Sequence, residues 1–219
     1  MAKYFNGIQG AFYGKVGSHV GRRWKGIDYI AAYKGSISQP NTPAQRRVRA
    51  RFGTLSRMST VFAPAILYGF QKVVKMTPYD RFVQVNWPQV TATGPDSVEV
   101  NYGMIQVAQG KLAGVNFGAV DYGETQHLTI SVAVNGSTGG TGADADDNVY
   151  LFAYCPDLNL GVLSAPVKRS ATAVTLSLPN NWDGQTVHVY GFARSSSANL
   201  AMGPDICSLS TYCGSGEIQ

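Results

Sequence analysis

Short runs in which apolar and polar residues alternate dominate the chain after residue 82, and Gly, Asn, Asp and Pro separate them. About seven runs follow this pattern, at 98–102, 105–108, 128–134, 149–154, 161–165, 174–178 and 187–192. A period of two is typical of half-buried strands, and turn residues at short, regular intervals favour antiparallel neighbours. The pattern predicts a mainly β fold, an antiparallel β-sandwich of immunoglobulin or fibronectin type, with strand signals starting at Phe82.

A helix signal stands before these runs. Thr42 is placed to cap a helix, Pro43 occupies the favoured first position, and Gln45 completes a capping box. Apolar residues then recur at helical spacing, at Val48, Phe52, Leu55, Met58 or Ser59, and Phe62. Pro64 is expected to end or kink this helix, a second short helix is expected to follow, and Thr77-Pro78 is expected to mark the exit.

The first 40 residues have a different composition. Glycine stands at positions 7, 10, 14, 17, 21, 26 and 35, with short extended runs between. Because glycine permits the positive φ of tight turns, this segment is predicted to form a glycine-rich hairpin. It holds too few large apolar residues for a core, so it is expected to lie as an arm on another surface. The expected division is an arm at 1–40, a basic helical segment at 41–76 and a β-sandwich domain at 77–219.

Charge is distributed unevenly along the chain. Residues 1–80 hold 13 Lys and Arg against two Asp, a net charge of +11, whereas residues 81–219 hold 5 basic and 11 acidic residues, −6. Such asymmetry indicates an anionic partner for the basic half. Three interpretations stay open: the basic residues contact carboxylates on another copy of the chain, they contact nucleic-acid phosphate, or they form a solvated face. The candidate interface residues are Trp24 with Arg22, Arg23 and Lys25, and Arg46, Arg47, Arg49 and Arg57 of the helix.

Catalysis and cofactor binding find little support in the sequence. It contains no GxSxG motif, no Walker loop and no Cys–His nucleophile motif, and its three His stand far from metal-ligand spacing. A non-enzymatic protein without a cofactor is therefore expected. Asp144, Asp146 and Asn148 alternate as the first ligands of a calcium loop do, but the sixth-position Gly and the closing Glu are missing. They are a weak candidate metal site, and a solvated loop is the favoured interpretation.

Two further features bear on where the protein is found. The N-terminus lacks the apolar core of a secretory signal, and no stretch approaches the roughly 18 apolar residues of a membrane span. The chain is expected to be synthesised in the cytoplasm without a signal peptide. Its final location stays open, and a virion and an extracellular assembly are the two alternatives. Cys155, Cys207 and Cys213 show neither metal nor disulfide spacing and are expected to be reduced structural thiols.

Several sequence motifs are shared with a known group of proteins. They are Gly14-Lys15-Val16-Gly17, Val20-Gly21, Trp24-Lys25-Gly26-Ile27, Asn41-Thr42-Pro43-Ala44-Gln45, Arg49-Ala50-Arg51-Phe52, Asp146-Asp147…Tyr154 and Val187-His188-Val189-Tyr190. With these motifs the chain resembles, over nearly its whole length, a family of uncharacterised Bacteroidota proteins, a domain of unknown function. That resemblance implies no known activity. The arm followed by the Thr-Pro-Ala-Gln helix is also loosely similar to small phage virion proteins.

These features together predict a non-enzymatic structural protein that assembles with other copies of itself, and with other structural proteins, into a homo-oligomer or polymer. A virion or extracellular filament component fits, with the arm docking on a neighbouring subunit. The alternative is a nucleic-acid-associated protein that uses the basic arm and the helix arginines. A third class, a carbohydrate- or ligand-binding sandwich, would need Trp87 or Trp182 as an exposed anchor.

Overall fold

A computed structural model describes residues 2–3, 12–36, 41–70, 76–122, 129–137, 143–196 and 206–218. The chain divides into two compact units, Met1–Asn41 and Thr42–Gln219, which we call the arm and the body. The body contains both the helical segment and the strands of the sandwich.

The arm is a four-stranded antiparallel sheet in the order β1-β4-β3-β2. Its strands are β1 (Ala2–Lys3), β2 (Gly14–Val16), β3 (His19–Trp24) and β4 (Ile27–Ala32). Lys25 and Gly26 form the β3–β4 turn, with φ of 48° and 80°. Positive φ at both central residues defines the type I′ turn, whose twist matches that of the flanking strands. Strands β2, β3 and β4 are thus a meander of two tight hairpins, and β1 pairs at the free edge of β4.

Helices α1 (Pro43–Val61) and α2 (Ala63–Gly69) open the body. The predicted capping box is present, because the Thr42 hydroxyl accepts a hydrogen bond from the Gln45 N–H and the Gln45 side chain accepts one from the Thr42 N–H. The predicted interruption at Pro64 is also present, since α1 ends at Val61 and Pro64 lies in the first turn of α2.

Thr77-Pro78 begins a helix instead of marking the exit from the helical segment. Helix α3 (Pro78–Asn86) has a second capping box, in which the Thr77 hydroxyl accepts from the Asp80 N–H and the Asp80 carboxylate accepts from the Thr77 N–H, both at 3.1 Å. The prediction that strand signals start at Phe82 was therefore wrong. Phe82 is fully buried on the inner face of α3.

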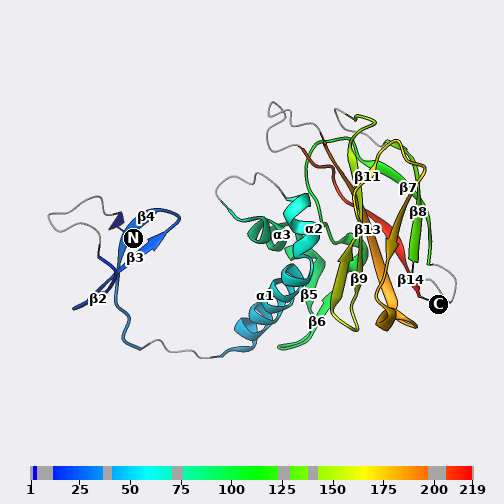
Figure 1. The fold of residues 1–219 in the computed structure, drawn as a ribbon. Helices are drawn as coiled ribbons and strands as arrows, with labels where there is room; N and C mark the ends of the chain where they lie inside the picture. Colours follow the sequence, from blue (N-terminus) through cyan, green and yellow to red (C-terminus); the bar gives the residue numbers. More distant parts are fainter. Residues whose placement is uncertain are drawn as a thin grey trace. The chain divides into compact units, whose positions relative to one another are not determined.

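The body holds two packed antiparallel sheets, with orders β10-β9-β13-β14 and β12-β8-β7, and β11 pairs with β9 beside β10 (Figure 1). The strands are β7 (Val115–Asp121), β8 (Thr129–Ser137), β9 (Asn148–Cys155), β10 (Leu160–Leu163), β11 (Val167–Lys168), β12 (Ala173–Ser177), β13 (Thr186–Arg194) and β14 (Thr211–Glu217). The predicted mainly β, antiparallel sandwich is confirmed, and the immunoglobulin type stays a prediction.

A separate ribbon pairs β5 (Val90–Ala92) with β6 (Val98–Val100). The predicted run at 98–102 coincides with β6, but the run at 105–108 is not a strand. It follows a 3₁₀ turn at Tyr102–Met104 and is apolar because Ile105, Val107 and Ala108 are buried in the core beneath the helices.

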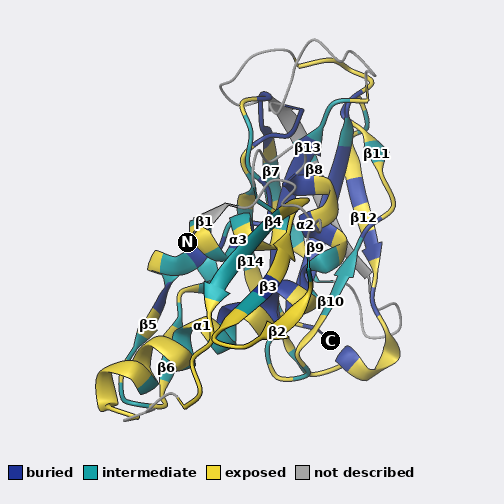
Figure 2. Cartoon of the chain, turned by 90° about the vertical axis from the view of Figure 1, so that its left-hand side faces the viewer, coloured by how far each residue is buried: buried dark blue, intermediate teal, exposed yellow. Residues whose placement is uncertain are grey.

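Two core clusters lie on opposite faces of the larger sheet. Tyr190 and Phe192 of β13 pack toward the helices, around Phe62 between α1 and α2, whereas Val187 and Val189 pack toward the smaller sheet. The Phe62 ring centroid lies 4.7 Å from that of Phe152 on β9. Because both faces of the larger sheet are covered, its two central strands are buried almost throughout (Figure 2).

The buried face of α1 differs from the predicted stripe. Leu55, Met58 and Phe62 are buried as expected, but Val48 and Phe52 are 55% and 56% exposed. The apolar residues of α1 lie at helical spacing on two neighbouring faces of the helix. Packing against the sheet buries the face that contains Leu55, Met58 and Phe62, and leaves Val48 and Phe52 exposed.

Candidate functional site

One face of the arm's sheet is open to solvent. Residues directly opposite each other in an antiparallel pair lie on the same face, and β3–β4 pairs Trp24 with Ile27 and Arg22 with Tyr29. Trp24 is 58% exposed and Ile27 is 39% exposed. We call this side the open face of the arm, with Val20, Arg22, Trp24, Ile27, Tyr29 and Ala31.

On the opposite face, Phe12 and Tyr13 of the arm itself contact the sheet. The backbone of Phe12 lies so close to Gly21 that a Cβ at this position would overlap it. On the same side, the Tyr13 hydroxyl donates to Asp28 at 3.0 Å, and Arg23 Nε lies 3.7 Å from the same carboxylate. Among residues 12–36, only Gly21 is buried. The described part of the arm therefore contains no apolar core.

Cations surround the aromatic residues of the arm. The Lys25 ammonium lies 5.0 Å from the Trp24 ring centroid, and the Lys15 ammonium lies 3.7 Å from that of Tyr33. The arm holds six basic residues and one acidic residue, whereas the body holds 12 of each, so the formal net charge of +5 belongs to the arm. The predicted cluster of Arg22, Arg23, Trp24 and Lys25 is solvent-exposed.

The predicted helix arginines have different environments. Arg46 pairs through two guanidinium nitrogens with Asp96, in the loop between β5 and β6 of the same chain, with Nε donating to Oδ1 at 2.9 Å. Arg47, Arg49 and Arg57 are exposed. The arginine cluster predicted as an interface is therefore divided, because Arg46 is engaged with a carboxylate of the same chain.

Arg51 was not among the predicted site residues, yet it holds the ribbon in place. Its guanidinium donates to the backbone carbonyl oxygens of Val90 at 2.6 Å and Trp87 at 2.7 Å, and it lies 4.2 Å from the Trp87 ring centroid. Arg51 stands four residues before Leu55 and seven before Met58, so helical spacing on the buried face was the available signal. Together, Arg51 and Arg46 fix the base and the loop of the β5–β6 ribbon on α1.

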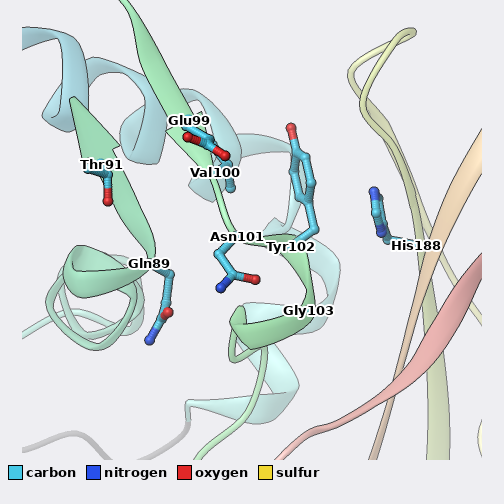
Figure 3. A pocket seen from close by; sticks show the side chains of 8 residues that line it. All are labelled: Gln89, Thr91, Glu99, Val100, Asn101, Tyr102, Gly103 and His188. Carbon is cyan, nitrogen blue, oxygen red and sulfur yellow. The ribbon is translucent and has the colours of Figure 1, made fainter. Parts of the chain in front are cut away.

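A cleft of about 460 Å³ opens on the outer face of this ribbon (Figure 3). Thr91 and Glu99 lie directly opposite each other on β5 and β6, and the Asn101 N–H extends the ribbon by donating to the Gln89 carbonyl oxygen at 2.9 Å. The residues that line the cleft are Gln89, Thr91, Glu99, Val100, Asn101, Tyr102, Gly103 and His188.

Tyr102 and His188 form an aromatic wall at one end of the cleft. Their rings are stacked with centroids 4.5 Å apart, and His188 Nδ1 lies 2.9 Å from the Tyr212 hydroxyl. Burial lowers the pKa of His188, which keeps the imidazole neutral at pH 7. Burial, followed by the nearby Asp157 carboxylate, raises the pKa of Tyr102. Of the described residues that line the cleft, only Glu99 is therefore charged at neutral pH.

Comparison with protein families gives one match. A model described as a family of unknown function (DUF6266) matches residues 10–206. The chain belongs to the DUF6266 family. Neither the curated proteins nor the solved structures gave a match. The match confirms the predicted membership of a domain family of unknown function, and it extends from the motifs of the arm past the end of β13, so that β14 lies beyond it.

The acidic loop of this DUF6266 chain has one residue turned inward. Asp144 and Asp146 are exposed and Asn148 begins β9, whereas Asp147 is buried with Arg169 Nη2 3.2 Å from its carboxylate. Asp147 also accepts a hydrogen bond from the Asp144 N–H at 3.0 Å. In the described ranges, no group of three or more His, Cys, Asp or Glu side chains is positioned to hold a metal ion.

The remaining candidates of the DUF6266 chain are structural. Cys155 and Cys207 are buried thiols and Cys213 is a partly buried one, and none of the three forms a disulfide. Trp182 is fully buried between the two sheets, so the idea of an exposed ligand anchor there was wrong. Trp87 is half-buried beneath the Arg51 guanidinium. No helix in the described part of the chain is long and apolar enough to cross a membrane.

Proposed function

We propose that this chain is a non-enzymatic structural protein that assembles head to tail with copies of itself, the arm of one copy docking on the body of the next. The open face of the arm carries the proposal. It exposes Trp24 and Ile27 on a sheet in which, among residues 12–36, only Gly21 is buried. A small sheet with an apolar face gains stability when another surface covers that face.

The distribution of charge supports the same arrangement. The arm carries the whole net charge of +5, whereas the body is formally neutral and exposes carboxylates such as Glu99, Asp144 and Asp183 that can meet it. The donor and acceptor surfaces differ, so the contact is heterologous, and repeated contacts of this kind form either a closed ring or an open polymer. Repeated contacts of this kind are what a component of a virion or an extracellular filament needs, and we propose one of these two roles for the chain.

Substitution of Trp24 tests the proposal. Large aromatic residues dominate interface energies, so Trp24→Ala is expected to weaken association by about 2–4 kcal/mol, which is roughly 30- to 800-fold in Kd. Sedimentation velocity over a concentration series of the full chain measures it, with Tyr79→Ala on α3 as a control for loss of an exposed aromatic ring. A wild type that stays monomeric up to its solubility limit would contradict the proposal.

The alternative is binding of nucleic acid by the same face. The exposed Trp24 indole among Arg22, Arg23 and Lys25 has the composition of a stacking platform for single strands. Phosphate binding weakens log-linearly with salt concentration, with a slope near 0.7 per contacted phosphate for single strands. A wild type that remains monomeric and retards single-stranded DNA with that salt dependence would replace self-assembly with this function.

A further inference from the structure

We infer that the cleft on the β5–β6 ribbon is the socket that receives the β3–β4 turn of a neighbouring copy. This inference rests on the proposed function and names the surface that accepts the arm. Its basis is complementarity between two described surfaces: a cleft whose one charged lining residue is Glu99, and a turn at which Trp24 and Lys25 stand together.

Charge complementarity is the first argument. The cleft contributes the Glu99 carboxylate, Asp157 lies near its Tyr102 wall, and its imidazole is neutral at pH 7. The β3–β4 hairpin contributes Arg22, Arg23 and Lys25 within four consecutive positions. Opposite potentials across an interface guide the encounter and fix its register.

The chemistry of the lining is the second argument. Beside the carboxylate, the amide side chains of Gln89 and Asn101 and the hydroxyl of Thr91 can bond the guanidinium groups and backbone amides of an incoming turn. The Tyr102 ring offers an aromatic surface to an indole or a cation. The cleft volume of about 460 Å³ lies within the roughly 300–1,000 Å³ range of specific binding clefts.

Both partners are rigid before they meet. The type I′ turn at Lys25 and Gly26 holds the tip of the hairpin in one backbone conformation. On the other side, Arg51 and Arg46 fix the ribbon to α1 at its base and its loop. Preorganised surfaces lose less conformational entropy on association, so even a small contact can be specific.

The exposed pair Val48 and Phe52 on α1 is a competing surface for the arm. Arg47 and Arg49 stand on either side of Val48 in the sequence, about 100° away around the helix. This surface would therefore bring positive charge against the positive arm, whereas the cleft brings negative charge. Electrostatics favours the cleft.

A charge-exchange experiment on the full chain tests the inference. Glu99→Lys and Lys25→Glu each place like charges at the contact, so each variant alone is expected to raise the Kd of self-association at least about tenfold. An equimolar mixture of the two variants pairs every arm with a complementary cleft and is expected to return to within about threefold of wild type. Asp183→Lys, at an exposed carboxylate outside the cleft, is the matched control and is expected to assemble normally.

The outcomes separate this inference from the proposed function. Loss of assembly with Trp24→Ala but not with Glu99→Lys would overturn the cleft as the socket and leave self-assembly in place. A wild type that never assembles would overturn both. A third outcome is a monomeric wild type in which Glu99→Lys increases amide exchange at the β3–β4 turn. This result would identify the chain's own arm as the occupant of the cleft, and it would overturn the inference that a neighbouring copy supplies the turn. Recovery of self-association in the mixture, but not in either variant alone, supports the inference that the turn of a neighbouring copy occupies the cleft.

Discussion

The Tyr190 hydroxyl donates a hydrogen bond of 2.8 Å to the backbone carbonyl oxygen of Tyr102. Tyr190 lies in the middle of β13, 88 residues further along the chain, and it is fully buried. This one bond connects the central strand of the larger sheet to the turn that forms the wall of the cleft. The position of the cleft wall therefore depends on the core of the body.

Tyr190→Phe is expected to destabilise the body by about 0.5–1.5 kcal/mol, because the Tyr102 carbonyl loses its donor in a partly buried environment. Urea unfolding followed by circular dichroism measures the change. The exposed Tyr79→Phe provides the control and is expected to change the free energy of unfolding by less than about 0.5 kcal/mol. Equal effects of the two substitutions would argue against a specific role for the bond.

Arg169→Met is expected to be more damaging. The Arg169 guanidinium donates to the carbonyl oxygens of Gly114 and Ala113 at 2.8 and 2.7 Å, and it lies 3.2 Å from the buried Asp147 carboxylate. Removing one member of a buried ion pair leaves an uncompensated charge and costs about 3–5 kcal/mol. Lys168→Met, at the exposed neighbouring position, is the control in the same urea titration. A similar stability for both variants would contradict this prediction.

Two glycine-to-alanine substitutions are expected to have opposite effects. At Gly191 on β13 a new Cβ would overlap the ring of Phe117, so Gly191→Ala is expected to destabilise the body by about 1–3 kcal/mol. At Gly53 on α1 a Cβ would meet no atom within 4 Å, and alanine is expected to stabilise the helix by up to about 1 kcal/mol. Thermal unfolding of both variants beside wild type measures the difference, and shifts of the same sign would contradict it.

The stability of the body is expected to fall in mildly acidic solution. Burial lowers the pKa of His188 in the folded protein, so the unfolded chain binds the proton more tightly. The stability contributed by the neutral imidazole is complete above the unfolded pKa of about 6.5 and is lost as the pH falls through the folded value. His188→Gln, compared with wild type in urea at several pH values, is expected to show a weaker decline between neutral and mildly acidic pH. Parallel curves would remove His188 as the cause.

The three thiols are expected to react slowly in the native protein. Burial raises the pKa of Cys213 to about 12, and Cys155 and Cys207 are buried, so little thiolate is accessible. Ellman's reagent at mildly alkaline pH is expected to modify them only slowly until urea unfolds the chain. Rapid modification of one thiol in the folded protein would show that its site opens readily.

Local signals in the sequence were sufficient for some elements. The capping box at Thr42 and the proline at position 64 fixed the limits of α1. Clean alternation identified β12, whereas β9 and β13 stood out as runs rich in β-branched and aromatic residues. The strand β14 was missed, because its sequence Thr-Tyr-Cys-Gly-Ser-Gly-Glu has too few apolar residues to alternate visibly. The helix α3 was missed because a Thr-Pro pair can end one helix or begin another, and only the Asp80 cap distinguishes these cases.

The candidate site was less predictable than the fold. The exposure of Trp24 follows from the β3–β4 register, which the glycine pattern suggested only in outline. The cleft joins residues 89–103 to His188, and the local pattern of β13 does not identify the neighbours of His188 in space. Contacts between such distant segments depend on how the layers pack, which no local periodicity encodes.

The burial of β13 on both faces has a consequence for the evolution of this family. A strand with one solvent-facing side can accept polar substitutions at every second position, but β13 has almost no such positions. We expect sequence drift to be concentrated in the arm and on the outer face of the ribbon, which carry few buried side chains. If these two surfaces bind each other, a substitution in one can be matched by a substitution in the other. Related proteins would then keep the same body, but the arm of one would no longer bind the cleft of another.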